Sequence, residues 1–281
     1  MTWKIETNME TNRLPKILCR AKRLSRLLKP VMPIFAAVYG FMMIYMTALP
    51  MADGNETFGR QVLSWGLTLV AIALTYILVH RVEPKVFPEA KQFSLKFPKP
   101  AIVLGLLLLA PLWGVVEGYA VYGLTSLMHT VQMEPITYTP DELREDLLAS
   151  VHAVLLAPVL EELCYRQLAI SPFRRRWVQV LVCVLMALLF GIVHVRNFPG
   201  AFLAAMFYGL VFIWTRNIWH AVVLHAGHNL TATLLAVYCF FGLGEIQMSR
   251  MPIFILSDVK IVVVAAVFAV IGFIILRIKL K

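Results

Sequence analysis

Residues 158–168 read PVLEELCYRQL, and in this stretch Glu161, Glu162 and Arg166 interrupt a run that is otherwise apolar. That run is one of eight, which lie at about 31–51, 62–80, 101–128, 148–170, 177–195, 200–215, 218–242 and 259–278. A helix crosses the hydrocarbon core of a bilayer with roughly 20 residues, so these lengths suit membrane spans. The runs do not alternate polar with apolar residues, which disfavours barrel strands. The sequence therefore predicts an all-α fold, a polytopic integral membrane helical bundle with about eight transmembrane helices.

The composition also indicates a membrane protein. Of the 281 residues, 60% are hydrophobic and 15% are charged, whereas a soluble domain has roughly 45–50% apolar and 25% charged residues. The net charge of +10 comes from bases that cluster beside the apolar runs, which favours a lipid bilayer over nucleic acid as the partner. The four cysteines are scattered, so the sequence predicts neither a disulfide framework nor a zinc ribbon.

The chain divides into a basic N-terminal arm, residues 1–29, and a membrane domain, residues 30–281. We expect the arm to lie in solvent against anionic headgroups. With eight spans, the bases of the arm, of the loop 81–99, of the cluster 174–176 and of the C-terminal tail all fall on one side. The positive-inside rule then predicts that both termini are cytoplasmic. We expect the inner membrane of a bacterial or archaeal cell.

Polar side chains inside the runs indicate function, because an ionisable group at mid-membrane costs at least about 2.5–3.5 kcal/mol on insertion scales. They occur at four places: Glu161, Glu162 and Arg166; the stretch FGIVH from Phe190 to His194; the stretch WHAVVLHAGHN with His220, His225, His228 and Asn229; and Glu117.

Helical spacing arranges these groups. Glu162 and Arg166 are four residues apart and can pair on one face, whereas Glu161 is turned about 100° away and is free for chemistry. His225 and Asn229 are also four residues apart, and FGIVH adds a histidine from a third helix. The sequence therefore predicts one intramembrane cavity at which three helices present polar groups.

The combination of residue types suits the activation of water. A carboxylate shielded from solvent beside a histidine can act as a general base, and a second histidine with an amide can donate hydrogen bonds to an oxyanion. No serine has a comparable place in the spans. Zinc remains an alternative, although HExxH is absent and the His225–Asn229 pair offers one good ligand. We expect no metal and no cofactor.

The three motifs, read in order, resemble a known family. EELCYR at 161–166, FGIVH at 190–194 and HAGHN at 225–229 are similar to EExxxR, FxxxH and HxxxN of the CPBP family, the CAAX-processing and bacteriocin-processing proteases, also called ABI proteins. The resemblance covers about residues 145–235. Many members have glycine after the arginine, where this chain has Gln167.

The resemblance implies a glutamic-type intramembrane endopeptidase that needs no metal. It implies that Glu161 activates water with the help of His194, and that His225 and Asn229 form the oxyanion hole. The supporting residues would be Glu162, Arg166 and Phe190. The partner would be a membrane-associated protein or peptide, lipidated or anchored by a transmembrane segment.

Several readings stay open. His194 lies near a predicted helix end, so an interfacial histidine is an alternative, and tilt or a kink at Pro158 must bring His194 level with Glu161. His220 and His228 are expected to pack or hydrogen-bond locally. Glu117 could support the site or line the substrate path rather than act in catalysis, and the role of His152 is equally open. Rival functions are a non-catalytic scaffold or immunity protein, a proton-coupled transporter and a zinc protease. The substrate could be a prenylated CAAX protein, a leader peptide or a C-terminal sorting helix.

Overall fold

The computed structural model describes residues 25–48, 58–128, 140–194, 198–243 and 259–279. Within these ranges the chain is helical and contains no β-strand, apart from an isolated bridge between Ser94 and Asn217. Most of the predicted basic arm lies outside the described residues. The elements are η1 (Lys29–Val31), α2 (Met32–Ala48), α3 (Phe58–Ile77), η3 (Leu78–Val82), α4 (Glu83–Val86), η4 (Pro88–Gln92), α5 (Pro100–Met128), α6 (Pro140–Leu155), α7 (Ala157–Glu162), η5 (Leu163–Leu168), α8 (Arg176–Val193), α9 (Phe198–Thr215), α10 (Ile218–Leu243) and α12 (Val259–Lys279).

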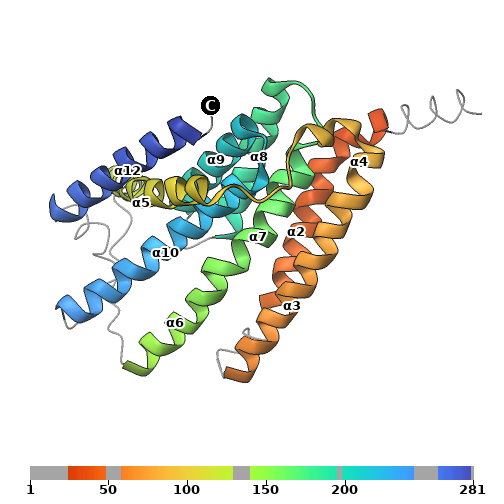
Figure 1. Ribbon diagram of the computed structural model, residues 1–281. Helices are drawn as coiled ribbons and strands as arrows, with labels where there is room; N and C mark the ends of the chain where they lie inside the picture. The colour runs from red at the N-terminus through yellow and green to blue at the C-terminus, as the bar shows by residue number, and fades with distance from the viewer. Residues whose placement is uncertain (1–24, 49–57, 129–139, 195–197, 244–258, 280–281) are drawn as a thin grey trace, which may run out of the picture.

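The helices are those of an integral membrane protein. Among the described residues seven helices are long and apolar enough to cross a membrane. The first is Ser25–Met46, which includes most of α2, and the others begin in α3, α5, α6, α8, α9 and α12. An eighth long helix, α10, carries three histidines and Asn229. It contacts α5, α6, α7 and α9 and so lies inside the bundle (Figure 1). The predicted all-α membrane bundle is therefore confirmed.

Helix α3 turns its polar residues inward and its apolar residues outward, as expected where lipid is the surrounding solvent. Gln61, Ser64, Thr68 and Thr75 recur at helical spacing and are buried. Leucines and valines on the other faces are exposed, including Leu74. The inner polar stripe bonds to other helices, since the Thr68 hydroxyl lies 2.8 Å from His152 of α6.

The segment that carries the acidic motif is broken twice. The sequence TPDEL at 139–143 is typical of a helix start with proline in the first turn, and α6 begins there, at Pro140, and ends at Leu155. Pro158 lacks a backbone N–H, so it suits the first turn of a new helix, and it lies in the first turn of the short α7. A π-helix, η5, follows at Leu163–Leu168, a geometry that often occurs at functional sites. The helix is therefore interrupted at Leu156, close to Pro158, where the sequence allowed for a kink.

Close helix packing depends on three glycines. A Cβ on Gly209 of α9 would lie 2.2 Å from the sulfur of Cys183 in α8. A Cβ on Gly227 of α10 would lie 2.9 Å from Ala110 of α5, and one on Gly272 of α12 would lie 2.6 Å from the backbone oxygen of Gly105. Small residues at such positions let helix backbones approach each other.

The predicted loop 81–99 is more ordered than its composition indicated, because η3, α4 and η4 occupy most of it. Its last part is tied to the turn between α9 and α10. Ser94 donates its N–H to the carbonyl of Arg216 at 2.6 Å, and Trp219 donates its indole N–H to the carbonyl of Leu95 at 2.9 Å. The start of α10 is thereby fixed before its histidines enter the bundle.

Glu83 provides a second anchor that the sequence did not indicate. Its carboxylate is 3% exposed and accepts hydrogen bonds from Ser171 and, at 3.1 Å, from the amide of Gln167. Gln167, the residue that departs from the glycine of the family motif, is thus bonded within the bundle. It connects η5 to α4.

Candidate active site

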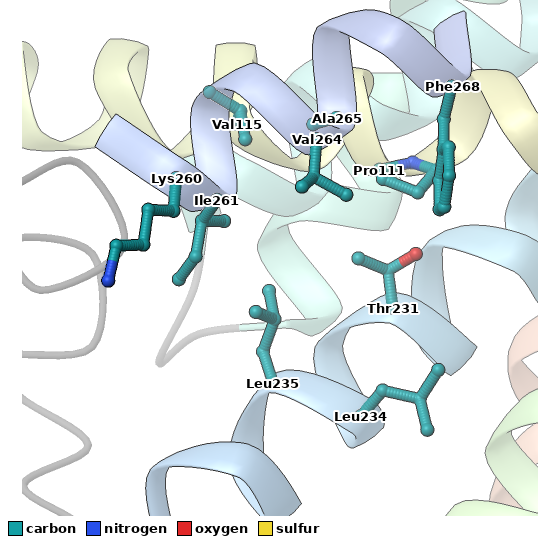
Figure 2. A pocket seen from close by; sticks show the side chains of 10 residues that line it. All are labelled: Pro111, Val115, Thr231, Leu234, Leu235, Lys260, Ile261, Val264, Ala265 and Phe268. Carbon is teal, nitrogen blue, oxygen red and sulfur yellow. The ribbon is translucent and has the colours of Figure 1, made fainter. Parts of the chain in front are cut away.

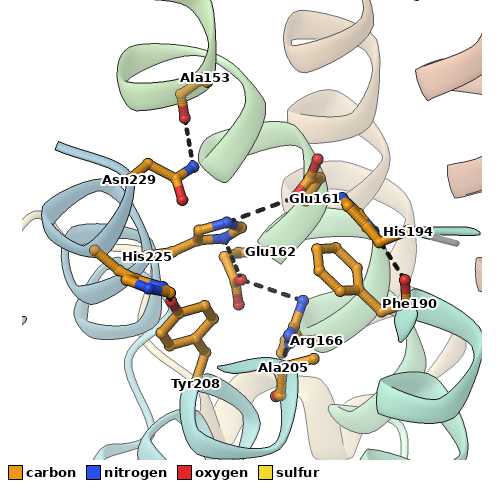
Figure 3. A network of polar contacts seen from close by, with 11 residues as sticks. Ala153, Glu161, Glu162, Arg166, Phe190, His194, Ala205, Tyr208, His225 and Asn229 are labelled. Atoms are coloured by element: carbon orange, nitrogen blue, oxygen red, sulfur yellow. Dashed lines mark hydrogen bonds and ion pairs between the residues drawn. The ribbon is translucent and has the colours of Figure 1, made fainter. Parts of the chain in front are cut away.

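Glu162 is the centre of a buried network that joins two helices (Figure 3). Its Oε1 lies 3.1 Å from Nη1 of Arg166, one turn further along, and the two side chains are 0% and 2% exposed. The same oxygen lies 3.0 Å from Nδ1 of His225 in α10. Arg166 also donates to the carbonyl of Ala205 in α9 at 3.0 Å. The predicted Glu162–Arg166 pair is confirmed, and it holds His225 as well.

The bond to Glu162 decides how the His225 ring is used. A carboxylate beside an arginine accepts hydrogen bonds, so Nδ1 of His225 carries the proton and Nε2 faces away from Glu162. That second nitrogen lies 3.7 Å from Oε2 of Glu161. Glu161 and His225 are 8% and 5% exposed, respectively. The two catalytic candidates from α7 and α10 are therefore brought together.

His194 is held at the C-terminal end of α8. Its Nδ1 lies 2.8 Å from the carbonyl oxygen of Phe190, which can only accept, so Nδ1 is the donor and Nε2 is left for another group. The Phe190 ring stacks on the His194 ring, with centroids 4.3 Å apart. The Arg166 guanidinium lies over the Phe190 ring, 5.4 Å from its centroid. Figure 3 shows the His194 ring beside the Glu161 carboxylate, so the helix-end position is compatible with membership of the cluster.

Asn229 lies one turn after His225 and has a partner that the sequence did not predict. Its Nδ2 donates to the carbonyl of Ala153 in α6 at 2.7 Å (Figure 3). The bond connects α10 to the segment that precedes Glu161. The amide keeps a second N–H, so its oxyanion role stays a prediction.

The other polar residues of the runs have separate places. His152 bonds to α3 rather than to the cluster, and Nδ1 of the buried His220 has no hydrogen-bond partner among the described residues. The expectation of local bonding was wrong for His228, which contacts Glu117 of α5 and Tyr208 of α9. Sequence reasoning missed Tyr208, whose only signal is a hydroxyl within an apolar helix.

A cavity of about 390 Å³ lies between α5, α10 and α12 (Figure 2). Its lining is almost entirely apolar, with Thr231 and Lys260 as the polar residues. None of the predicted catalytic residues lines it. Across the described ranges, no group of three or more His, Cys, Asp or Glu side chains is arranged to hold a metal ion.

Comparison with known proteins agrees with the motifs. Residues 143–231 match the family of type II CAAX prenyl endopeptidase Rce1-like proteins, and this segment contains all three motifs. No curated protein and no solved structure matches the chain. The family match confirms the resemblance to CPBP proteins and indicates a membrane protease of the CAAX type.

Proposed function

From the premise of a CAAX-type membrane protease, we propose that the chain is a glutamic-type intramembrane endopeptidase. It hydrolyses a peptide bond of a membrane-associated protein or peptide with water activated by Glu161. The observation that carries the proposal is the buried approach of Glu161 and His225, whose Oε2 and Nε2 atoms are 3.7 Å apart. A water oxygen can lie about 2.8 Å from both atoms across that separation, within hydrogen-bond distance of each.

Glu161 is the general base. Its carboxylate takes one proton from water as the water oxygen attacks the scissile carbonyl carbon, and the carbonyl π electrons move onto oxygen. The proton then passes from Glu161 to the leaving nitrogen as the C–N bond breaks, which gives a carboxylic acid and an amine. His194 supports this step, because its Nδ1 is engaged by Phe190 and its Nε2 is left to accept a hydrogen bond from the water.

His225 and Asn229 stabilise the oxyanion. With Nδ1–H bound to Glu162, His225 donates to the oxyanion from Nε2 when the ring carries both protons. The second N–H of the Asn229 amide is the other donor. Donors fixed before the reaction are worth roughly 100–1,000-fold in rate each. Glu162 and Arg166 position the first donor and are not themselves reactants.

The substrate is expected to be lipidated or anchored by a transmembrane segment, because the cluster is buried among membrane helices. A prenylated CAAX protein is one candidate, in line with the description of the matched family. Both termini of the chain are proposed to be cytoplasmic.

The test compares the termini of membrane proteins in cells that carry the wild-type chain, Glu161→Gln or Glu89→Gln. Glu89 is a partly exposed carboxylate paired with Lys29, away from the cluster, and serves as the control. New termini that are present with the wild type and Glu89→Gln, and absent with Glu161→Gln, support the proposal and identify the substrate.

Identical profiles for all three, at equal expression, refute proteolysis and favour a scaffold. Glu161-dependent proton flux in vesicles would favour a transporter. Stoichiometric bound zinc with loss of cleavage in chelator would favour a zinc protease.

A further inference from the structure

A second polar chain reaches the face of the His225 ring, whereas Glu161 and Glu162 lie by its two nitrogens. Its first member is Glu117 in α5, whose Oε2 lies 3.2 Å from Nε2 of His228. Nδ1 of His228 lies 2.5 Å from the hydroxyl of Tyr208. The Tyr208 ring stacks on the His225 ring, with centroids 4.7 Å apart and planes 20° apart. Four side chains from three helices are thus in consecutive contact.

A hydrogen bond joins Nδ1 of His228 to the Tyr208 hydroxyl, and Nε2 of the same ring lies beside the Glu117 carboxyl group at ion-pair distance. The hydroxyl is held in one direction, and the phenol ring is held with it. Tyr208 is 1% exposed and Glu117 is 7% exposed, so solvent does not compete for these bonds.

The stack has a consequence for His225. The stack limits rotation of the imidazole plane, while Glu162 fixes Nδ1. Together the two contacts determine where Nε2 points.

We infer that Glu117, His228 and Tyr208 form a positioning relay that orients His225 for oxyanion binding in this chain. The relay rests on the proposed function and adds positioning residues that lie outside the three motifs. None of the three is a catalytic residue, since each acts through His225. The relay connects α5 and α9 to the catalytic helix α10.

The relay predicts a specific kinetic defect. Tyr208→Leu removes the stack, and a small misplacement of a catalytic group can cost about 100-fold in rate. We expect kcat to fall by that order while KM stays within about twofold, because the lost interaction acts in the transition state. Tyr208→Phe keeps the stack and is expected to lose no more than about tenfold. Glu117→Gln, which keeps a polar group of similar size beside His228, should resemble Tyr208→Phe, whereas Glu117→Leu should approach Tyr208→Leu.

Phe207→Leu is the matched control. Phe207 is the neighbouring residue of α9 and stacks on Trp113 of α5 at 4.1 Å, so it joins the same two helices without a ring contact to His225. Each variant is first checked for a thermal midpoint within a few degrees of the wild type, and Tyr208→Phe keeps the test available if Tyr208→Leu does not fold. In that case the relay requires Glu117→Leu to lower kcat more than Glu117→Gln.

The outcomes separate the relay from the function. If cleavage depends on Glu161 but folded Tyr208→Leu keeps the wild-type kcat, only the relay is refuted. Equal losses in Phe207→Leu and Tyr208→Leu refute it too, because general packing would then explain both. If the wild type shows no Glu161-dependent cleavage, the proposed function is refuted and the relay falls with it. A loss of kcat confined to the relay variants supports the inference.

Discussion

Replacing Arg166 by methionine keeps most of the side-chain volume but removes the charge that neutralises Glu162. The two side chains are 2% and 0% exposed, and their atoms are 3.1 Å apart. Removing one member of such a buried pair costs about 3–5 kcal/mol, since the other charge remains buried without its partner. His225, 3.0 Å from the same carboxylate oxygen, offsets part of this cost when it is protonated. We therefore expect the free energy of unfolding to fall by about 3 kcal/mol, the lower end of that range.

The assay is reversible unfolding in mixed micelles, followed by tryptophan fluorescence. The matched control is Arg174→Met, because Arg174 is an exposed arginine and an exposed charge contributes about 0–1 kcal/mol. The double variant Glu162→Gln/Arg166→Met removes both charges and should recover about 1–3 kcal/mol of the loss.

The reasoning is wrong if Arg166→Met unfolds within about 1 kcal/mol of the wild type. It is also wrong if the double variant is no more stable than Arg166→Met. Either result would mean that the pair is not buried as tightly as its exposures indicate.

Packing and anchoring give three further expectations, all measured by the same unfolding assay. Gly209→Ala should lower the free energy of unfolding by about 1–3 kcal/mol, because the added Cβ would lie 2.2 Å from the Cys183 sulfur. Adding Cys183→Ala should restore most of the loss. Gly272→Leu should separate α12 from α5 and lower the free energy of unfolding at least as much, because its Cβ would lie 2.6 Å from the backbone oxygen of Gly105. An unchanged unfolding midpoint would contradict this packing. Glu83→Leu leaves two buried donors without an acceptor and should cost about 1–3 kcal/mol for each, whereas Glu89→Gln at a part-exposed pair should cost less than about 1 kcal/mol.

The sequence predicted the parts of the structure that depend on local rules. Apolar run length located the membrane helices, and four-residue spacing predicted the Glu162–Arg166 pair. Proline at position 140 marked the start of α6. These features need only the geometry of one helix, so a single sequence contains the information.

The contacts that complete the site depend on how helices tilt against one another. Glu162 and His225 are 63 residues apart, and no local rule relates them. The π-helix η5 has no distinctive sequence, yet its extra residue per turn changes which faces later side chains occupy. Asn229 donates to the backbone carbonyl of Ala153. Because every residue has a backbone carbonyl, the sequence does not show which one will accept this bond. The stack of Tyr208 on His225 was likewise unpredictable, since aromatic residues in membrane helices mostly contact lipid or core.

The separation of the acidic motif from α10 also has a consequence during synthesis. Glu162 and Arg166 are four residues apart and can pair as soon as their helix forms. Glu161 is synthesised 64 residues before His225 (225 minus 161), its partner from α10. At about 5–20 residues per second, the ribosome needs roughly 3–13 s to add those residues. For that interval the proposed general base has been synthesised and the proposed oxyanion donors of α10 have not, so under the proposed mechanism the nascent chain cannot cleave a substrate until α10 enters the bundle.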